Sequence, residues 1–170
     1  DKNSLQAVMD KGESARIREY DPSIYQKIAG AEGTTGLVFI RRNGSEGIDK
    51  RTYAYDDGTP HYLALTANEK NTIRAAKEQC GKVVVVLNAA NPMEVSPLMS
   101  GEFEADAVVW MGTAGSRGFA SLGKVLSGAV NPSGRLTDIY ATDFTKDPTY
   151  ANFGEYRYTN AQFVDNQLFG

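Results

Sequence analysis

The feature that most constrains the fold is residues 82–88, which read Lys-Val-Val-Val-Val-Leu-Asn. The run is apolar and β-branched, and it does not alternate with polar residues. A strand of this kind is buried on both faces, which is typical of the centre of a parallel sheet covered by helices. We therefore predict that residues 82–88 form a central parallel strand.

Strands and helices are expected to alternate along the middle of the chain. Thr66 and Glu69 form a capping box, in which each side chain binds the other residue's free backbone N–H, and this pattern starts a helix. The expected elements are strands at residues 37–40 and 106–111, helices at 66–79, 92–99 and 118–126, and a turn at 131–134. Alternation with short links predicts the α/β class, here a three-layer α/β/α sandwich with a mostly parallel central sheet.

The two ends of the chain are less regular. Apolar spacing suggests a helix at residues 3–10, a strand at 15–20 and a helix at 22–29, whereas the polar, aromatic residues after 138 carry no run long enough for a core strand. The length of 170 residues suits one domain with a tail. We expect a domain over residues 1–140 and an irregular extension over 141–170.

Composition excludes several classes of function. The formal net charge is -3 and the basic residues are scattered, so the chain lacks the basic stripe of a nucleic-acid-binding protein. No apolar run approaches the roughly 20 residues of a membrane span, and the first residues lack the apolar core of a signal peptide. We expect neither a nucleic-acid partner nor a membrane. Either a cytoplasmic or a secreted location, of bacterial type, fits this sequence.

Few residues could hold a metal or act as a nucleophile. The chain has one cysteine, Cys80, and one histidine, His61, so we expect no metal site and no cofactor. We interpret Cys80 as a small buried group near a helix end and His61 as a solvated loop residue. The glycine-rich residues 112–118 follow a strand and open a helix, but their spacing is wrong for dinucleotide binding.

The connection between residues 41 and 65 is the strongest candidate for a functional segment. It is long for a compact domain, and it carries Glu46 beside small residues after a predicted strand. In open α/β sheets, ligands bind at the carboxyl ends of the strands. The tyrosines at positions 53, 55 and 62 could stack on a sugar ring or pin the loop to the domain, and both interpretations stay open.

Three motifs in this order resemble the C-terminal α/β sandwich domain of family 3 glycoside hydrolases, the β-glucosidase and β-xylosidase group. Residues 42–50, Arg-Asn-Gly-Ser-Glu-Gly-Ile-Asp-Lys, are similar to the family's Arg…Gly-Glu-Gly-Tyr-Asp-Arg loop. Residues 83–94 are similar to its valine-rich strand ending in Leu-Asn-x-x-x-Pro. Residues 105–136 end in Asn-Pro-Ser-Gly-Arg-Leu, which matches the family's signature.

The loop departs from the family pattern at three positions. Ser45 replaces a glycine, Ile48 replaces a tyrosine, and Lys50 replaces an arginine. The glycine-rich residues 112–118 also lack the acidic or amide residue that the family often has there. The family's opening strand has no counterpart in this sequence, so the chain resembles an incomplete piece of a larger enzyme.

The resemblance implies a role for Glu46, because the family's general acid/base occupies this position. The nucleophilic aspartate comes from a preceding (β/α)8 barrel, which would be the partner domain, and the substrate would be a terminal β-linked sugar. Arg42 and Asp49 are expected to shape the loop or lie near the sugar, and Tyr53 to contact the substrate. A non-catalytic carbohydrate-binding or interaction module, or a small flavodoxin-like domain with another ligand, stays open as an alternative.

Overall fold

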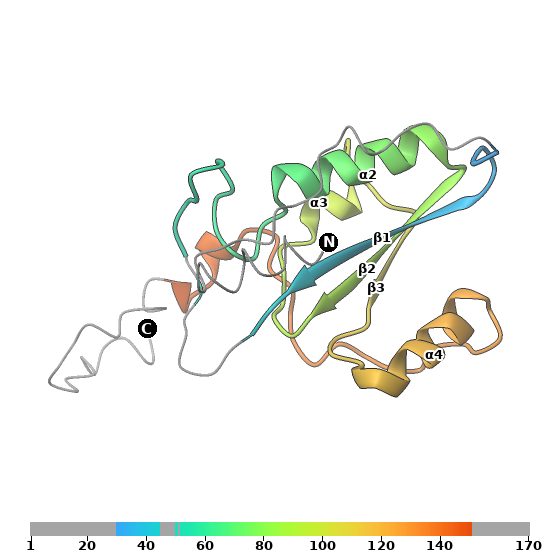
Figure 1. Ribbon diagram of the computed structural model, residues 1–170. Coiled ribbons are helices and arrows are strands. Elements are labelled where there is room, and N and C mark those ends of the chain that lie inside the picture. The colour runs from blue at the N-terminus through green and yellow to red at the C-terminus, as the bar shows by residue number, and fades with distance from the viewer. Residues whose placement is uncertain (1–29, 45–49, 51, 151–170) are drawn as a thin grey trace, which may run out of the picture.

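The computed structural model describes residues 30–44, 50 and 52–150 of the chain (Figure 1). Its elements are β1 (Thr35–Arg42), α2 (Ala67–Gln79), β2 (Lys82–Ala89), α3 (Ser96–Met99), β3 (Ala107–Trp110), α4 (Gly115–Leu126) and the 3-10 helix η3 (Phe144–Lys146). The elements predicted at 3–10, 15–20 and 22–29 lie outside the described residues, as does the part of the extension beyond 150.

The sheet contains β1, β2 and β3 in that order, and both pairings are parallel. β1 pairs with β2 along its whole length, from Thr35 opposite Lys82 to Arg42 opposite Ala89. The valine-rich strand is therefore the central one among the described strands, as its sequence predicted. All three strands end at one side, which we call the carboxyl edge of the sheet.

Helices cover the two faces of the sheet, so the molecule has three layers. α2 and α3 lie on one face and α4 on the other (Figure 1). The face under α2 forms the core, where Ile73 of α2 meets Val85 of β2 and Ile40 of β1, all at 0% or 1% exposure. The predicted α/β/α sandwich is confirmed.

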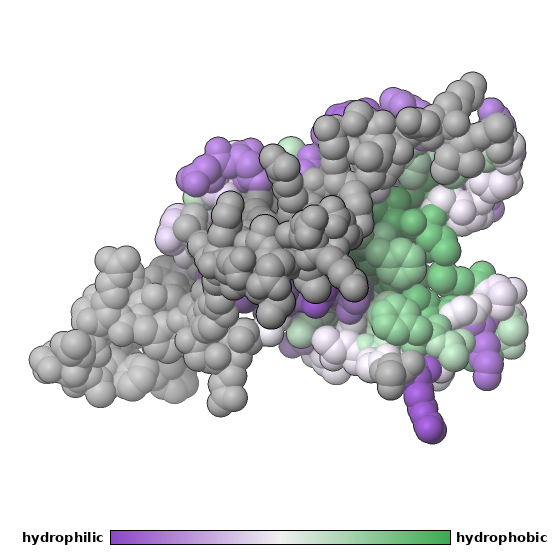
Figure 2. Space-filling model, in the orientation of Figure 1, coloured by the Kyte–Doolittle hydropathy of each residue, from purple (hydrophilic) through white to green (hydrophobic). Residues whose placement is uncertain are grey.

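The opposite face of the sheet is less covered. Its members on β1, Leu37 and Phe39, are 46% and 52% exposed, although Val86 at the centre of the sheet is fully buried. Figure 2 shows apolar atoms gathered at the end of the molecule where α2 and α4 face each other across the sheet. We predicted that the central strand is buried on both faces. On this second face Val86 is buried, as predicted, whereas Val84 is only half-buried.

Two predicted helices have other bounds in the structure. α3 spans Ser96–Met99, shorter than the predicted 92–99, because Pro97 would break a helix that began at residue 92 but is tolerated in a first turn, where no backbone N–H is needed. α4 starts at Gly115 rather than at Gly118. Gly118 lies inside the first turn, where an added Cβ would come within 2.6 Å of the Ala114 side chain, so this glycine permits the earlier start.

Candidate functional site

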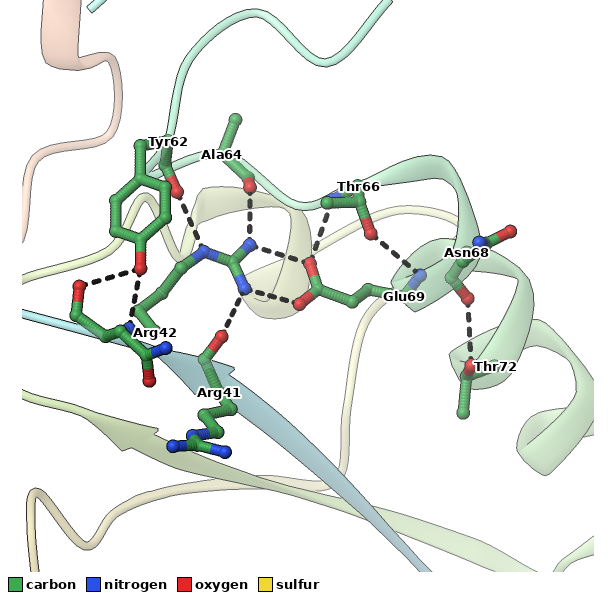
Figure 3. A network of polar contacts seen from close by, with 9 residues as sticks. Arg41, Arg42, Tyr62, Ala64, Thr66, Asn68, Glu69 and Thr72 are labelled. Atoms are coloured by element: carbon green, nitrogen blue, oxygen red, sulfur yellow. Dashed lines mark hydrogen bonds and ion pairs between the residues drawn. The ribbon is translucent and has the colours of Figure 1, made fainter. Parts of the chain in front are cut away.

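Arg42, the last residue of β1, is fixed at the carboxyl edge by five hydrogen bonds (Figure 3). Its guanidinium donates to the carbonyls of Arg41, Tyr62 and Ala64 and to both carboxylate oxygens of Glu69. A guanidinium has five N–H donors, and all five are used here. The residue is also buried, at 7% exposure. Of the two roles expected for Arg42, this network supports shaping the loop.

Glu69 connects this network to the start of α2. It is the N3 residue of the capping box predicted from the sequence, so its carboxylate also accepts from the backbone N–H of Thr66 at 2.9 Å. The Thr66 hydroxyl in turn accepts from the Glu69 N–H at 3.2 Å. One carboxylate therefore joins the first turn of α2 to the end of β1, which places both elements on one rigid unit.

Tyr62 holds the backbone that follows β1. Its hydroxyl accepts from the N–H of Asn43 at 2.6 Å and donates to the carbonyl of the same residue at 2.7 Å. The Tyr62 ring also lies within cation–π distance of the Arg42 guanidinium carbon, at 5.7 Å, and of the Lys50 ammonium, at 5.5 Å. Of the two roles left open for the loop tyrosines, Tyr62 pins the loop.

A segment over residues 142–150, which we call the strap, lies against the same edge. Its Tyr150 hydroxyl donates to the carbonyl of Thr52 at 3.2 Å, and its Thr142 carbonyl accepts from the Ser96 hydroxyl at 2.9 Å. Inside the strap, Asp143 accepts from the Thr145 N–H and hydroxyl. This hydrogen bonding, followed by the nearby Lys146 ammonium, lowers the pKa of the Asp143 carboxyl below its usual 3.8.

His61 corrects the sequence interpretation, because it is buried at 3% exposure rather than solvated. Its Nε2 lies 3.0 Å from Oε1 of Glu94, and its ring contacts the ring of Phe144 at 5.2 Å between centroids. The same carboxylate oxygen of Glu94 accepts from the Phe144 N–H. His61 is buried because the long connection, the residues before α3 and the strap converge on it, and its partner Glu94 lies 33 residues away. No local spacing signals such a pair.

A shallow cavity of about 270 Å³ opens at the carboxyl edge between the ends of β1 and β2 and the start of α4. Arg41 and Asn88 line it from paired strand positions, and Thr113 and Phe119 line it from the β3–α4 side. Its wall combines hydrogen-bonding groups with one aromatic ring. Such a surface suits a ligand that carries hydroxyl groups on an apolar frame.

The other predicted site residues divide into two groups. Glu46 and Asp49 lie outside the described residues, between Gly44 and Lys50. Tyr53 is 63% exposed and follows directly after Thr52, the residue that the strap holds. Sequence reasoning missed the His61–Glu94 pair and the contacts of the strap, whereas it named Tyr62, with Tyr53 and Tyr55, as a residue that either stacks on a sugar or pins the loop.

Among residues 30–44, 50 and 52–150, no three acidic, histidine or cysteine side chains gather in a way that could bind a metal ion. None of the helices in that part of the chain combines the length and apolar character needed to cross a bilayer.

Comparison with known proteins gives a consistent picture. The glycosyl hydrolase family 3 C-terminal domain matches residues 21–169. A "Beta-glucosidase" of Ruminococcus albus is 32% identical over 127 residues, which are 75% of this chain and 13% of that protein. "Beta-glucosidase 1" of Aspergillus aculeatus is 28% identical over 125 residues, 74% of this chain and 14% of that protein.

A solved structure shares the fold. It is described as a novel beta-glucosidase from Paenibacillus barengoltzii, and it superposes with a TM-score of 0.64 at 23% sequence identity. The match covers 90% of this chain and 17% of that chain. The chain thus spans well under a fifth of the length of these relatives.

Proposed function

The chain belongs to the glycosyl hydrolase family 3 C-terminal domain family, and from this premise we propose that it supplies the general acid/base, Glu46, to a retaining β-glycosidase. The rest of the active site, including the nucleophile, comes from a (β/α)8 barrel domain. The substrate is a terminal β-linked sugar, of the kind that the relatives named β-glucosidases act on.

One observation carries the proposal: the backbone at the end of β1 is held in place just before Glu46 in the sequence. Asn43, three positions before Glu46, is bonded through both its N–H and its carbonyl to Tyr62. The preceding Arg42 is locked to Glu69 and three carbonyls. An acid/base acts through its position relative to the bond that breaks, so a rigid attachment at the carboxyl edge suits this role.

The chemistry needs two carboxyl groups about 5–5.5 Å apart. In the first step, the barrel's carboxylate attacks the anomeric carbon while Glu46 gives its proton to the leaving oxygen. The C–O bond to the leaving group breaks, and a covalent glycosyl-enzyme forms. In the second step, Glu46, now a carboxylate, takes a proton from water, and that water releases the sugar with retained configuration.

A partner domain is supported by the length of the relatives. The matched region is 13–14% of the two named β-glucosidases, so most of each relative lies outside the region that this chain matches. A general acid alone contributes only about 10²–10⁴-fold, far less than the total rate enhancement of an enzyme. We therefore propose that the chain works only together with the barrel.

The remaining predicted residues take supporting roles in this proposal. Arg42 shapes the loop, and Asp49 shapes the loop or lies near the sugar. Tyr53 contributes an exposed aromatic ring at the rim, where it can contact the substrate. The cavity between Arg41, Asn88 and Phe119 adds hydrogen-bonding groups and a second ring at the carboxyl edge.

The experiment is a panel of nitrophenyl glycosides, assayed on the 170-residue chain and on the full-length protein that contains it. We expect turnover of at least one β-glycoside by the full-length protein and none by the chain alone. Robust turnover by the 170-residue chain would contradict the need for a barrel. Inactivity of both proteins, with binding of a sugar by the chain, would favour a non-catalytic carbohydrate-binding module.

A further inference from the structure

We propose that Tyr62 is a positioning residue for the proposed acid/base, because it contacts Asn43 and Lys50, which lie on either side of Glu46 in the sequence. This inference rests on the proposed function, because it concerns the loop that carries the proposed acid/base. It assigns a specific task to a residue of the long connection, 16 positions after Glu46 in the sequence.

The hydroxyl of Tyr62 holds the first end of the loop. It accepts the Asn43 N–H at 2.6 Å and donates to the Asn43 carbonyl at 2.7 Å. The Tyr62 hydroxyl therefore pairs with both the N–H and the carbonyl of Asn43, the first residue after the end of β1. Two hydrogen bonds to one residue fix the direction of the backbone as well as its position.

The ring of Tyr62 contacts the side chain of Lys50 at the second end. The Lys50 ammonium lies 5.5 Å from the ring centroid, within the range of a cation–π contact. Lys50 is the first described residue after Asp49. One side chain therefore contacts Asn43 and Lys50, which are seven positions apart and on opposite sides of Glu46.

Tyr62 can act as an anchor because its own backbone is fixed. Its carbonyl accepts from Nε of Arg42 at 2.7 Å, and Arg42 is bound to Glu69 in the first turn of α2. The contacts run from α2 through Arg42 to Tyr62 (Figure 3). From Tyr62 they continue to Asn43 and Lys50. A shift of the phenol hydroxyl would therefore displace the Asn43 backbone relative to the sheet.

The first test measures the tether without any catalytic reaction. In the 170-residue chain, Tyr62→Phe keeps the ring and removes both hydrogen bonds to Asn43. Amide hydrogen exchange at Asn43 should become about tenfold faster, as expected for a lost hydrogen bond. Tyr140→Phe is the matched control, because the Tyr140 hydroxyl makes no hydrogen bond within the described residues, and exchange at Asn43 should stay as in the wild type. Unchanged exchange in Tyr62→Phe would overturn the proposal.

The second test separates positioning from general stability in the full-length glycosidase. A misplaced general acid lowers the rate of hydrolysis of substrates whose leaving group needs a proton, and it has little effect on substrates with a good leaving group. Tyr62→Phe should therefore lower kcat for a disaccharide about tenfold and leave the first step with a dinitrophenyl glycoside within about twofold. An equal loss with both substrates, or no loss with either, would overturn the positioning role.

The two tests also distinguish this inference from the proposed function. If Glu46→Gln has no effect on disaccharide hydrolysis, Glu46 is not the acid, and the proposed function fails. Faster exchange at Asn43 in Tyr62→Phe would then still establish the tether, whereas its role in positioning an acid would be lost with the acid.

Discussion

Both carboxylate oxygens of Glu69 accept hydrogen bonds from the guanidinium of Arg42, with Nη2 at 2.8 Å from Oε2. The two side chains are 14% and 6% exposed, so the pair is largely shielded from water. The same carboxylate caps α2. This ion pair therefore ties the end of β1, which precedes the candidate loop, to a residue 27 positions away.

Glu69→Gln tests this ion pair. Glutamine can still occupy the capping box, but it removes the carboxylate charge that pairs with the buried Arg42 guanidinium. We expect a loss of about 3–5 kcal/mol in the free energy of unfolding, measured by urea denaturation. Glu102→Gln is the matched control, because Glu102 pairs with Arg74 at the surface and should cost less than about 1 kcal/mol. Equal losses in the two variants would show that burial does not strengthen the pair.

Val85→Asp tests the sheet assignment. Val85 is fully buried between β1 and β3, and an unpaired carboxylate there should destabilise the fold by more than about 4 kcal/mol. Val130→Asp makes the same change at a position that is 47% exposed and should alter stability by less than about 0.5 kcal/mol. Thermal melting followed by circular dichroism compares them, and a wild-type melting curve for Val85→Asp would refute the central position of β2.

Much of this fold could be predicted from local sequence patterns. The capping box at Thr66 and Glu69 involves residues three positions apart, and the valine run needs no partner to indicate burial on both faces. These features depend on neighbours along the chain, so the helix Ala67–Gln79 and the strand Lys82–Ala89 were predicted closely.

Contacts between distant residues could not be read in the same way. His61 lies among aspartate, glycine and proline, a composition typical of a solvated turn, and only the fold brings Glu94 and Phe144 to it. Arg42 was singled out through the family motif, but its five acceptors come from the strand end, the long connection and α2. The proposed role of Glu46 still rests on the family motif and on the backbone beside it.

Glu94→Ala tests the attachment of the strap. The Glu94 carboxylate accepts from the Phe144 N–H and contacts His61, so its removal leaves a buried imidazole without this partner and should cost about 1–3 kcal/mol. Amide exchange within residues 142–150 should accelerate. In Glu104→Ala, which removes an exposed carboxylate, exchange in the strap should match the wild type. Wild-type exchange in the strap of Glu94→Ala as well would show that Glu94 does not attach it.

The Asp143 carboxyl should titrate below 3.8, because hydrogen bonds from Thr145, followed by Lys146, favour its charged form. Its pKa is lower in the folded than in the unfolded state, so its contribution to stability is present above the unfolded pKa. That contribution is lost as the pH falls through the folded pKa. Titration by NMR should show the pKa rising toward 3.8 in Thr145→Ala, and an unchanged pKa would exclude Thr145 as the cause.

The central claim is that Glu46 is the acid/base, and Glu46→Gln in the full-length enzyme tests it most directly, with Asp49→Asn made beside it. We predict a severe loss with disaccharides, a much smaller effect on the first step with activated aryl glycosides, and recovery of turnover with those substrates on adding azide. Azide needs no deprotonation, so the product should be a glycosyl azide of retained configuration. Disaccharide hydrolysis by Glu46→Gln within about twofold of the wild type would contradict the claim, since general acid catalysis contributes about 10²–10⁴-fold.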